Sequence, residues 1–136
     1  DDGETVSYGA TWRAAGRRRI ATLGIGYADG YRRALSNRGV ALVRRKRVPI
    51  AGIVTMDMIM LDVTDVRCEL GDVATLLGRD GDDLLTVDAV ADTAQMLSYE
   101  LLVGLKLRVP RVYVDDAERS SDVSAGRASG TSDARQ

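Results

Sequence analysis

The apolar residues of this sequence fall in short runs that end at glycine or aspartate. Short runs in which apolar and polar residues partly alternate are typical of β-strands, and Gly and Asp favour the turns between strands. This pattern of short apolar runs separated by turn residues predicts a mainly β fold. The basic turn 44–47 predicts a hairpin, and residues 78–81 are expected to form a turn. The segments expected to be strands are residues 5–13, 19–27, 40–43, 48–54, 58–63 and 72–77.

The hydrophobic period changes near the C-terminal end. Val87, Val90, Ala91 and Ala94 would share one helical face, and Thr86 suits the N-cap of that helix. A second short helix is expected over residues 99–106 with Ser98 as its cap, followed after Pro110 by a strand over residues 111–114. The pattern therefore predicts a barrel-like or sandwich-like β domain with two short helices late in the chain.

Residues 115–136 differ in composition from the rest of the chain. They are rich in Asp, Ser, Ala, Gly and Arg and contain almost no large apolar residues, so we expect a disordered tail. The folded domain is accordingly expected over residues 1–114. Because the chain begins with Asp1 and not with Met, we also expect a processed or partial polypeptide.

Composition excludes several classes of function. The absence of His and the single Cys exclude Ser-His-Asp and Cys-His catalysis, disulfide scaffolds, most zinc sites and Cys-rich metal or iron–sulfur sites. No metal site is expected. A net charge of −1 does not indicate a nucleic-acid-binding protein. The basic clusters 17–19 and 44–47 are interpreted as solvated turns. No apolar run reaches the roughly 18 residues of a membrane span, and no signal peptide is visible. We expect a cytoplasmic location and neither nucleic-acid nor membrane partners.

Three local patterns allow both a structural and a functional interpretation. The glycine-rich segment 24–30 has the spacing GxGxxxG without a βαβ context, which favours a strand ending in a turn over a phosphate loop. Tyr27 and Arg33 nevertheless place phenol and guanidinium groups beside it, a surface suited to an anion. Met56, Met58 and Met60 alternate as core residues do, and Asp57 among them needs a partner such as Arg.

Six segments in order resemble the C-terminal domain of bacterial alanine racemases. The resemblance covers residues 5–114, most of the chain, and each segment is weak alone. The segments read VSYGAT (6–11), GIGYADGYRRALSN (24–37), PIAGIVTMDMIMLDVT (49–64), GDVATLLG (71–78), MLSYELL (96–102) and RVPRVYV (108–114).

The resemblance implies a β-barrel-like C-terminal domain and a complete enzyme of larger size. Alanine racemases are isomerases that interconvert L-alanine and D-alanine with pyridoxal phosphate for peptidoglycan synthesis. The family's cofactor lysine lies in an N-terminal α/β barrel domain that this chain lacks, and neither Lys46 nor Lys106 stands in an apolar context that suits the role. The family works as a homodimer in which the β domain of one subunit completes the site of the other. The isolated chain is therefore expected to be inactive.

The resemblance also implies roles for individual residues. Tyr8 matches the base on the L-alanine side. Met56 matches the residue whose main-chain N–H binds the substrate carboxylate, and Tyr99 matches the tyrosine that contacts the cofactor phosphate. The residues that match the lining of the substrate corridor are Tyr27, Arg33 and Asp57. A phenol, with an ordinary pKa of about 10, is a poor base until a cation lowers that value, and the family supplies the cation from the barrel.

Two departures and two alternatives accompany this interpretation. Many family members carry Arg where this chain has Ile53, so one corridor charge is missing, and many carry Gly-Tyr-Pro-Arg where it has Gly30-Tyr31-Arg32-Arg33. One alternative is a stand-alone, non-catalytic β module that binds anions or a protein. The other is the same domain from a racemase of another amino acid.

Overall fold

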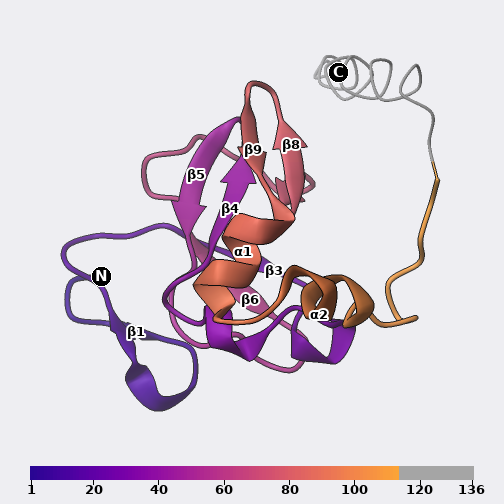
Figure 1. Cartoon of the computed structure of the whole chain (residues 1–136). Helices are drawn as coiled ribbons and strands as arrows, with labels where there is room; N and C mark the ends of the chain where they lie inside the picture. The colour runs from indigo at the N-terminus through magenta and orange to yellow at the C-terminus, as the bar shows by residue number, and fades with distance from the viewer. Residues whose placement is uncertain (114–136) are drawn as a thin grey trace, which may run out of the picture.

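The computed structural model describes residues 1–113, and strands make up most of its regular structure (Figure 1). The expected disordered tail and its boundary after Val114 lie outside the described residues. The strands are β1 (Thr5–Val6), β2 (Trp12–Arg13), β3 (Ile20–Leu23), β4 (Val40–Val43), β5 (Lys46–Pro49), β6 (Ile59–Asp62), β7 (Ala74–Thr75), β8 (Gly78–Asp80) and β9 (Asp83–Leu85). The helices are α1 (Val87–Ala94) and α2 (Ser98–Val103), with single 3₁₀ turns η1 (Tyr8–Ala10), η2 (Tyr27–Asp29) and η3 (Arg33–Leu35).

Two antiparallel sheets form the centre of the domain. One pairs β3 with β6, with Ala21 opposite Leu61, and the other has the order β5-β4-β7. Ile50, directly after β5, makes an isolated bridge to Leu61 of β6, so the two sheets follow one another in the order β3-β6-β5-β4-β7. The expected mainly β fold with two short helices is confirmed. Among residues 1–113, however, the sheets do not close into a barrel.

The core lies between these sheets and α1. Leu42, Ile59 and Leu61 are fully buried, and Val90 and Ala91 belong to the same buried cluster. The period of the sequence explains this arrangement, since β6 buries alternate residues and α1 buries one face. In Figure 1 the N-terminal β1 region projects away from the main body.

The methionine pattern was only partly interpreted correctly. Met60 is partly buried within β6, but the side chains of Met56 and Met58 are 52% and 46% exposed. The expectation that all three fill the core is therefore wrong. The reason is that β6 begins only at Ile59, so the alternation of a strand does not extend back to Met56.

The first helix is as predicted and the second is shorter. The Thr86 hydroxyl accepts a hydrogen bond from Ala89 N–H (3.1 Å), which confirms its role as the N-cap. The second helix ends at Val103, and its N-cap is Leu97, whose N–H donates to the Glu100 carboxylate (3.0 Å). Ser98, the predicted cap, instead bonds Asp88 on α1.

The predicted strands 19–27, 48–54 and 72–77 have other bounds in the structure, where β3 is Ile20–Leu23, β5 is Lys46–Pro49 and β7 is Ala74–Thr75. Three further predicted elements differ in kind. Residues 5–13 form a hairpin around η1, because Ser7 and Gly9 adopt positive φ and end the strand. Residues 78–81 are not simply a turn, since β8 pairs with β9 around Gly81. Residues 111–113 form no strand, because they find no pairing partner in the described part of the chain. No helix within residues 1–113 is both long enough and apolar enough to span a membrane.

Candidate functional site

A pocket of about 480 Å³ brings together five of the six residues singled out from the sequence. It lies between η1, the loop after β3 and the turn before β6. The predicted residues that line it are Tyr8, Tyr27, Arg33, Met56 and Asp57. Ile53, Val54, Thr55 and Met58 complete the lining. Three segments that are distant in the sequence therefore meet at one site.

The turn Thr55–Met58 is held by its own hydrogen bonds. Thr55 N–H donates to the Met58 carbonyl (3.0 Å), and the Thr55 hydroxyl both donates to that carbonyl (2.9 Å) and accepts from Met58 N–H (3.1 Å). Thr55 is buried, so this clamp is shielded from water. Within residues 1–113, the Met56 N–H has no hydrogen-bond partner. The turn therefore fixes the main chain of a pocket-lining residue whose N–H has no acceptor in the described part of the chain.

The loop after β3 docks against the same turn through the main chain. Tyr27 N–H donates to the Thr55 carbonyl and Ala28 N–H to the Met56 carbonyl, both at 3.0 Å. This approach requires glycine at position 26, where a Cβ atom would lie 2.3 Å from the Thr55 carbonyl oxygen. The loop closes on itself because the Asp29 carboxylate accepts from Gly26 N–H (2.8 Å). The position of Tyr27 beside Met56 is thus fixed by main-chain contacts.

Tyr8 is placed at the pocket by its neighbour Ser7. The Ser7 hydroxyl donates to the Ile53 carbonyl at 2.8 Å, which ties η1 to the segment before the Thr55–Met58 turn. Gly52 permits this contact, since a Cβ there would lie 2.6 Å from the Ser7 Cβ. The Tyr8 side chain is 74% exposed, and no hydrogen bond engages its hydroxyl within residues 1–113. The phenol is therefore free to act on a molecule bound at the pocket.

Arg108 links the two acidic residues of the site. Its Nη2 donates to Asp57 (2.8 Å), and its Nε lies 3.3 Å from a carboxylate oxygen of the buried Asp29. The hydrogen bond to Asp57, and then the charge of Asp29, raise the pKa of Arg108 above its ordinary value. The expectation that Asp57 needs an Arg partner is confirmed. One guanidinium therefore holds both the loop after β3 and the turn before β6.

Tyr99 stands apart from the other predicted residues. It lies in the first turn of α2, its side chain is 81% exposed, and it does not line the pocket. The first turn of α2 is instead fixed by Glu100 and by contacts with α1. Any role for Tyr99 in the same site thus requires a molecule that extends beyond the pocket.

Sequence reasoning missed Arg108, Asp29 and Ser7 as parts of the site. Arg108 and Asp29 both belong to segments that carry the resemblance, RVPR and YADG, and this was the available signal. Their contact joins positions that are far apart in the chain, so no local pattern could reveal it. Within residues 1–113, no three acidic or thiol side chains are grouped in a way that could hold a metal ion.

Comparison with known proteins identifies the family. Residues 1–113 match the family model described as alanine racemase, C-terminal domain. The chain is 50% identical over 115 residues to alanine racemase 2 of Bacillus subtilis, with 84% of this chain and 29% of that protein covered. It is 46% identical over 112 residues to an alanine racemase of Symbiobacterium thermophilum, with 82% and 30% covered.

A solved structure agrees with these matches. The crystal structure of an alanine racemase from Bartonella henselae with covalently bound pyridoxal phosphate superposes with a TM-score of 0.77 at 32% identity. The match covers 84% of this chain and 31% of that one. The chain thus spans about 30% of the length of the relatives that it matches. This protein belongs to the alanine racemase family, as a member of its C-terminal domain.

Proposed function

We propose that this domain supplies one face of the active site of a pyridoxal-phosphate-dependent alanine racemase. The observation that carries the proposal is the pocket in which Tyr8 and Met56 meet Tyr27, Arg33 and Asp57. Racemisation removes the α-proton from one face of the substrate and returns a proton to the other. Two bases on opposite sides are therefore needed, and this domain contributes one of them.

The Met56 N–H is proposed to bind the substrate carboxylate. Its lack of a partner within residues 1–113 supports this role, since an N–H left without an acceptor at a pocket favours an anion. The clamped turn holds the donor in place before the substrate arrives. Arg33 on the pocket wall adds positive charge, while Tyr27 and Asp57 line the approach as corridor residues.

Tyr8 is proposed to move the proton on the L-alanine side. Its hydroxyl stands at the pocket with no competing hydrogen bond among the described residues, so it is available to the substrate. The Ser7 tether sets the distance between this phenol and the Met56 turn. A carboxylate held at Met56 would then fix which face of the substrate Tyr8 meets.

The residues of the pocket fit only part of a pyridoxal phosphate site. Neither of the two lysines lines the pocket, so the covalent anchor must come from another domain. Tyr99, exposed at the start of α2, is available to contact a phosphate. When bound, pyridoxal phosphate disperses the negative charge left by removal of the α-proton. This division of the site supports a complete enzyme with an N-terminal barrel. We further propose, from the family resemblance, that this enzyme is a homodimer in the cytoplasm.

The proposal is tested by a chimera in which residues 1–113 replace the matching segment of the Bacillus subtilis alanine racemase 2. Loss of α-deuterium from labelled L-alanine and from labelled D-alanine is measured separately by NMR. Tyr8→Phe is expected to slow loss from L-alanine by about 10²-fold or more, because the general base is removed. Loss from D-alanine should persist, since the base on that side belongs to the barrel.

A matched control is Tyr113→Phe, which removes another exposed phenol outside the pocket. It should leave both rates unchanged. If the Tyr8→Phe chimera loses α-deuterium from L-alanine as fast as from D-alanine, Tyr8 is not the base on the L-alanine side. The isolated 136-residue chain should form no D-alanine with added pyridoxal phosphate, and formation of D-alanine would refute the division of the site between domains.

A further inference from the structure

Asn37, two residues after η3, is hydrogen-bonded to two other segments of the chain. Its side-chain oxygen accepts from Gly52 N–H (2.7 Å), and its own N–H donates to the Gly52 carbonyl (3.0 Å). Its side-chain Nδ2 donates to the Thr11 hydroxyl (3.0 Å). The amide of Asn37 therefore uses its acceptor on one segment and its donor on the other, which also fixes the orientation of the amide.

Both of these segments hold η1, the turn that carries Tyr8. Ser7 is the residue at the N-terminal end of η1, and Thr11 is the residue at its C-terminal end. The Ser7 hydroxyl donates to the carbonyl of Ile53, which lies in the segment that Asn37 also binds. The turn is thus tied at both ends, and Asn37 takes part in both ties.

The main chain of η1 needs such ties because its conformation is unfavourable. Ser7, Gly9 and Ala10 have positive φ, at 68°, 72° and 49°. Residues other than glycine adopt this left-handed region at a cost in free energy, so the surrounding contacts must hold them there. The Tyr8 side chain is mostly exposed and adds little packing to the turn. The position of the phenol therefore depends on the ties at Ser7 and Thr11.

We propose that Asn37 is a positioning residue, which holds Tyr8 where its hydroxyl meets the substrate. Asn37 does not line the pocket, so it acts through Gly52 and Thr11. This inference rests on the proposed role of Tyr8 as the base on the L-alanine side. Its consequence is asymmetric. Loss of the ties displaces the base on one face of the substrate and leaves the base on the other face in place, since that base belongs to the barrel.

The experiment uses the chimera that carries residues 1–113 in the Bacillus subtilis alanine racemase 2. Loss of α-deuterium is measured separately from L-alanine and from D-alanine. Asn37→Gly removes both side-chain bonds without straining the main chain, because glycine readily adopts the φ of 56° at this position. It should slow loss from L-alanine by about 10-fold or more, since misplacing a reacting group by about 1 Å costs up to about 100-fold. Loss from D-alanine should change by less than about 2-fold, because the base on that side is not moved.

Asn37→Asp tests whether the hydrogen bonds themselves carry the effect. The carboxylate accepts from Gly52 N–H as the amide does, and it also accepts from the Thr11 hydroxyl, which rotates to donate. Asp also tolerates a positive φ. Asn37→Asp should therefore keep most of the rate that Asn37→Gly loses. A rate as low as that of Asn37→Gly would show that these bonds do not act on Tyr8.

Thr11→Val removes only the tie at the C-terminal end of η1, and it is the second test if Asn37→Gly does not fold. It should slow loss from L-alanine less than Asn37→Gly does, and again without slowing loss from D-alanine. The two effects should not add, because Asn37→Gly already removes the bond to Thr11. The matched control is Thr93→Val, which removes a hydroxyl that donates to the Ala89 carbonyl (2.8 Å) on α1. It should leave both rates unchanged.

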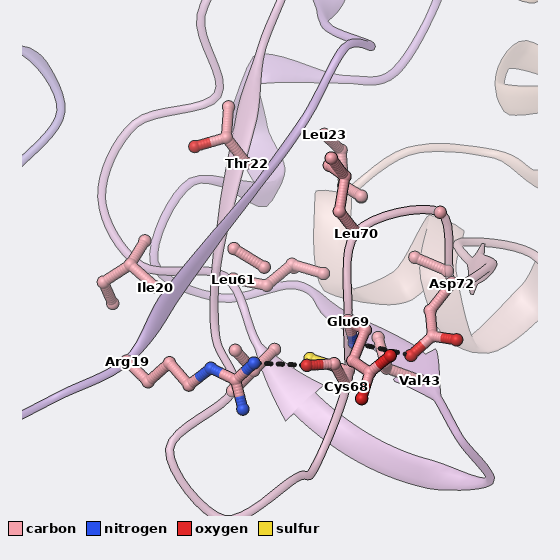
Figure 2. Close-up of a pocket in the computed structure, with 14 residues that line it drawn as sticks. Arg19, Ile20, Thr22, Leu23, Val43, Leu61, Cys68, Glu69, Leu70 and Asp72 are labelled. Carbon is pink, nitrogen blue, oxygen red and sulfur yellow. Dashed lines mark hydrogen bonds between the residues drawn. The ribbon is translucent and has the colours of Figure 1, made fainter. Parts of the chain in front are cut away.

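A second control loosens a loop elsewhere in the domain. The loop of residues 68–72 is held by the Arg19 guanidinium, which donates to the Cys68 carbonyl (Figure 2). This loop borders a pocket whose lining includes none of the residues predicted for the site. Arg19→Met removes the tie, and any loss of rate should then be equal for the two enantiomers. The asymmetry distinguishes Asn37 from a residue that only stabilises the fold.

Main-chain dynamics of the 136-residue chain give a reading that needs no cofactor. In Asn37→Gly, the NMR order parameters of Tyr8 and Gly9 should fall from about 0.85, typical of a rigid main chain, toward about 0.6. The order parameter of Val90 on α1 should not change, which checks that the fold is intact. If the chimera does not assemble, these order parameters decide the question.

Two results would overturn the proposal and leave the role of Tyr8 intact. One is that Asn37→Gly slows both enantiomers equally, or neither, while Tyr8→Phe slows only loss from L-alanine. The other is that the order parameter of Tyr8 is the same with and without the Asn37 side chain. If Tyr8→Phe itself does not slow loss from L-alanine, the proposed function fails, and this inference fails with it.

Discussion

Replacing Gly26 with alanine tests whether the loop after β3 holds the Thr55–Met58 turn in position. The added Cβ would lie 2.3 Å from the Thr55 oxygen and 2.4 Å from the Met56 oxygen, where ordinary contact begins at 3.4 Å. The two segments must therefore separate by about 1 Å, which breaks the hydrogen bonds of Tyr27 and Ala28 to the turn. At about 1 kcal/mol for each bond and about 1–3 kcal/mol for overpacking, the free energy of unfolding should fall by about 3–5 kcal/mol.

The assay is equilibrium unfolding of the 136-residue chain in urea, followed by far-UV circular dichroism. Gly24→Ala is the matched control, because no atom lies within 4 Å of a Cβ at that position and its φ is not positive. It should change the free energy of unfolding by less than about 1 kcal/mol. If Gly26→Ala and Gly24→Ala unfold at the same urea concentration with the same slope, the close main-chain approach does not stabilise the site, and the reasoning fails.

Two further predictions concern side chains whose surroundings the structure defines. Burial raises the pKa of Tyr31 to about 12, and its hydroxyl has no hydrogen-bond partner within residues 1–113. Tyr31→Phe should therefore raise the free energy of unfolding by about 1 kcal/mol at pH 7. Above pH 10 the unfolded chain releases the Tyr31 proton before the folded chain does, so the free energy of unfolding should fall between pH 10 and pH 12. The fall should be less steep in Tyr31→Phe. If urea titrations give the same dependence on pH for both proteins, this prediction is contradicted. Arg108→Ala leaves the buried Asp29 without its cation and should lower the urea midpoint more than the control Arg111→Ala does, with a smaller difference at high salt. Equal midpoints at low salt would show that the link from Arg108 does not stabilise the loop.

Much of the fold could be predicted because local patterns agree with the final packing. The β4–β5 hairpin follows from two apolar runs around a basic turn, and α1 follows from one apolar face and a threonine cap. Two of the four cationic side chains of residues 44–47 are paired with carboxylates, since Arg44 and Arg47 form bidentate pairs with Asp72 and Asp83. These pairs lower the pKa of both aspartates, chiefly through the arginine hydrogen bonds. The predicted turn 44–47 is too long, because Lys46 and Arg47 belong to β5 and only Arg44 and Arg45 form the turn. All four residues are exposed, as expected for solvated side chains, but their partners could not be predicted.

The parts that were not predicted depend on contacts distant in the sequence or on main-chain geometry. The hairpin β8–β9 carries Arg, Asp and Gly, a composition that also suits a simple turn, and only the pairing distinguishes the two. The Arg108 contact with Asp29 and Asp57 forms when the segment after α2 folds back over the loop after β3, and Lys106 N–H donates to the Asp29 carbonyl at 2.9 Å in the same place. The sequence could indicate which residue types meet at the pocket, but not that one guanidinium joins them.

The clamp around Thr55 has a consequence for how this protein tolerates change. The position of the Met56 N–H is set by bonds that belong to Thr55, Met58 and Ala28, and the half-exposed methionine side chain takes no part in them. Every amino acid except proline has the same N–H. Position 56 is thus a place where a library of side chains could alter the shape of the pocket while the proposed anion donor, the main-chain N–H, stays unchanged. If that donor binds the substrate carboxylate as proposed, position 56 is a starting point for redesigning substrate choice.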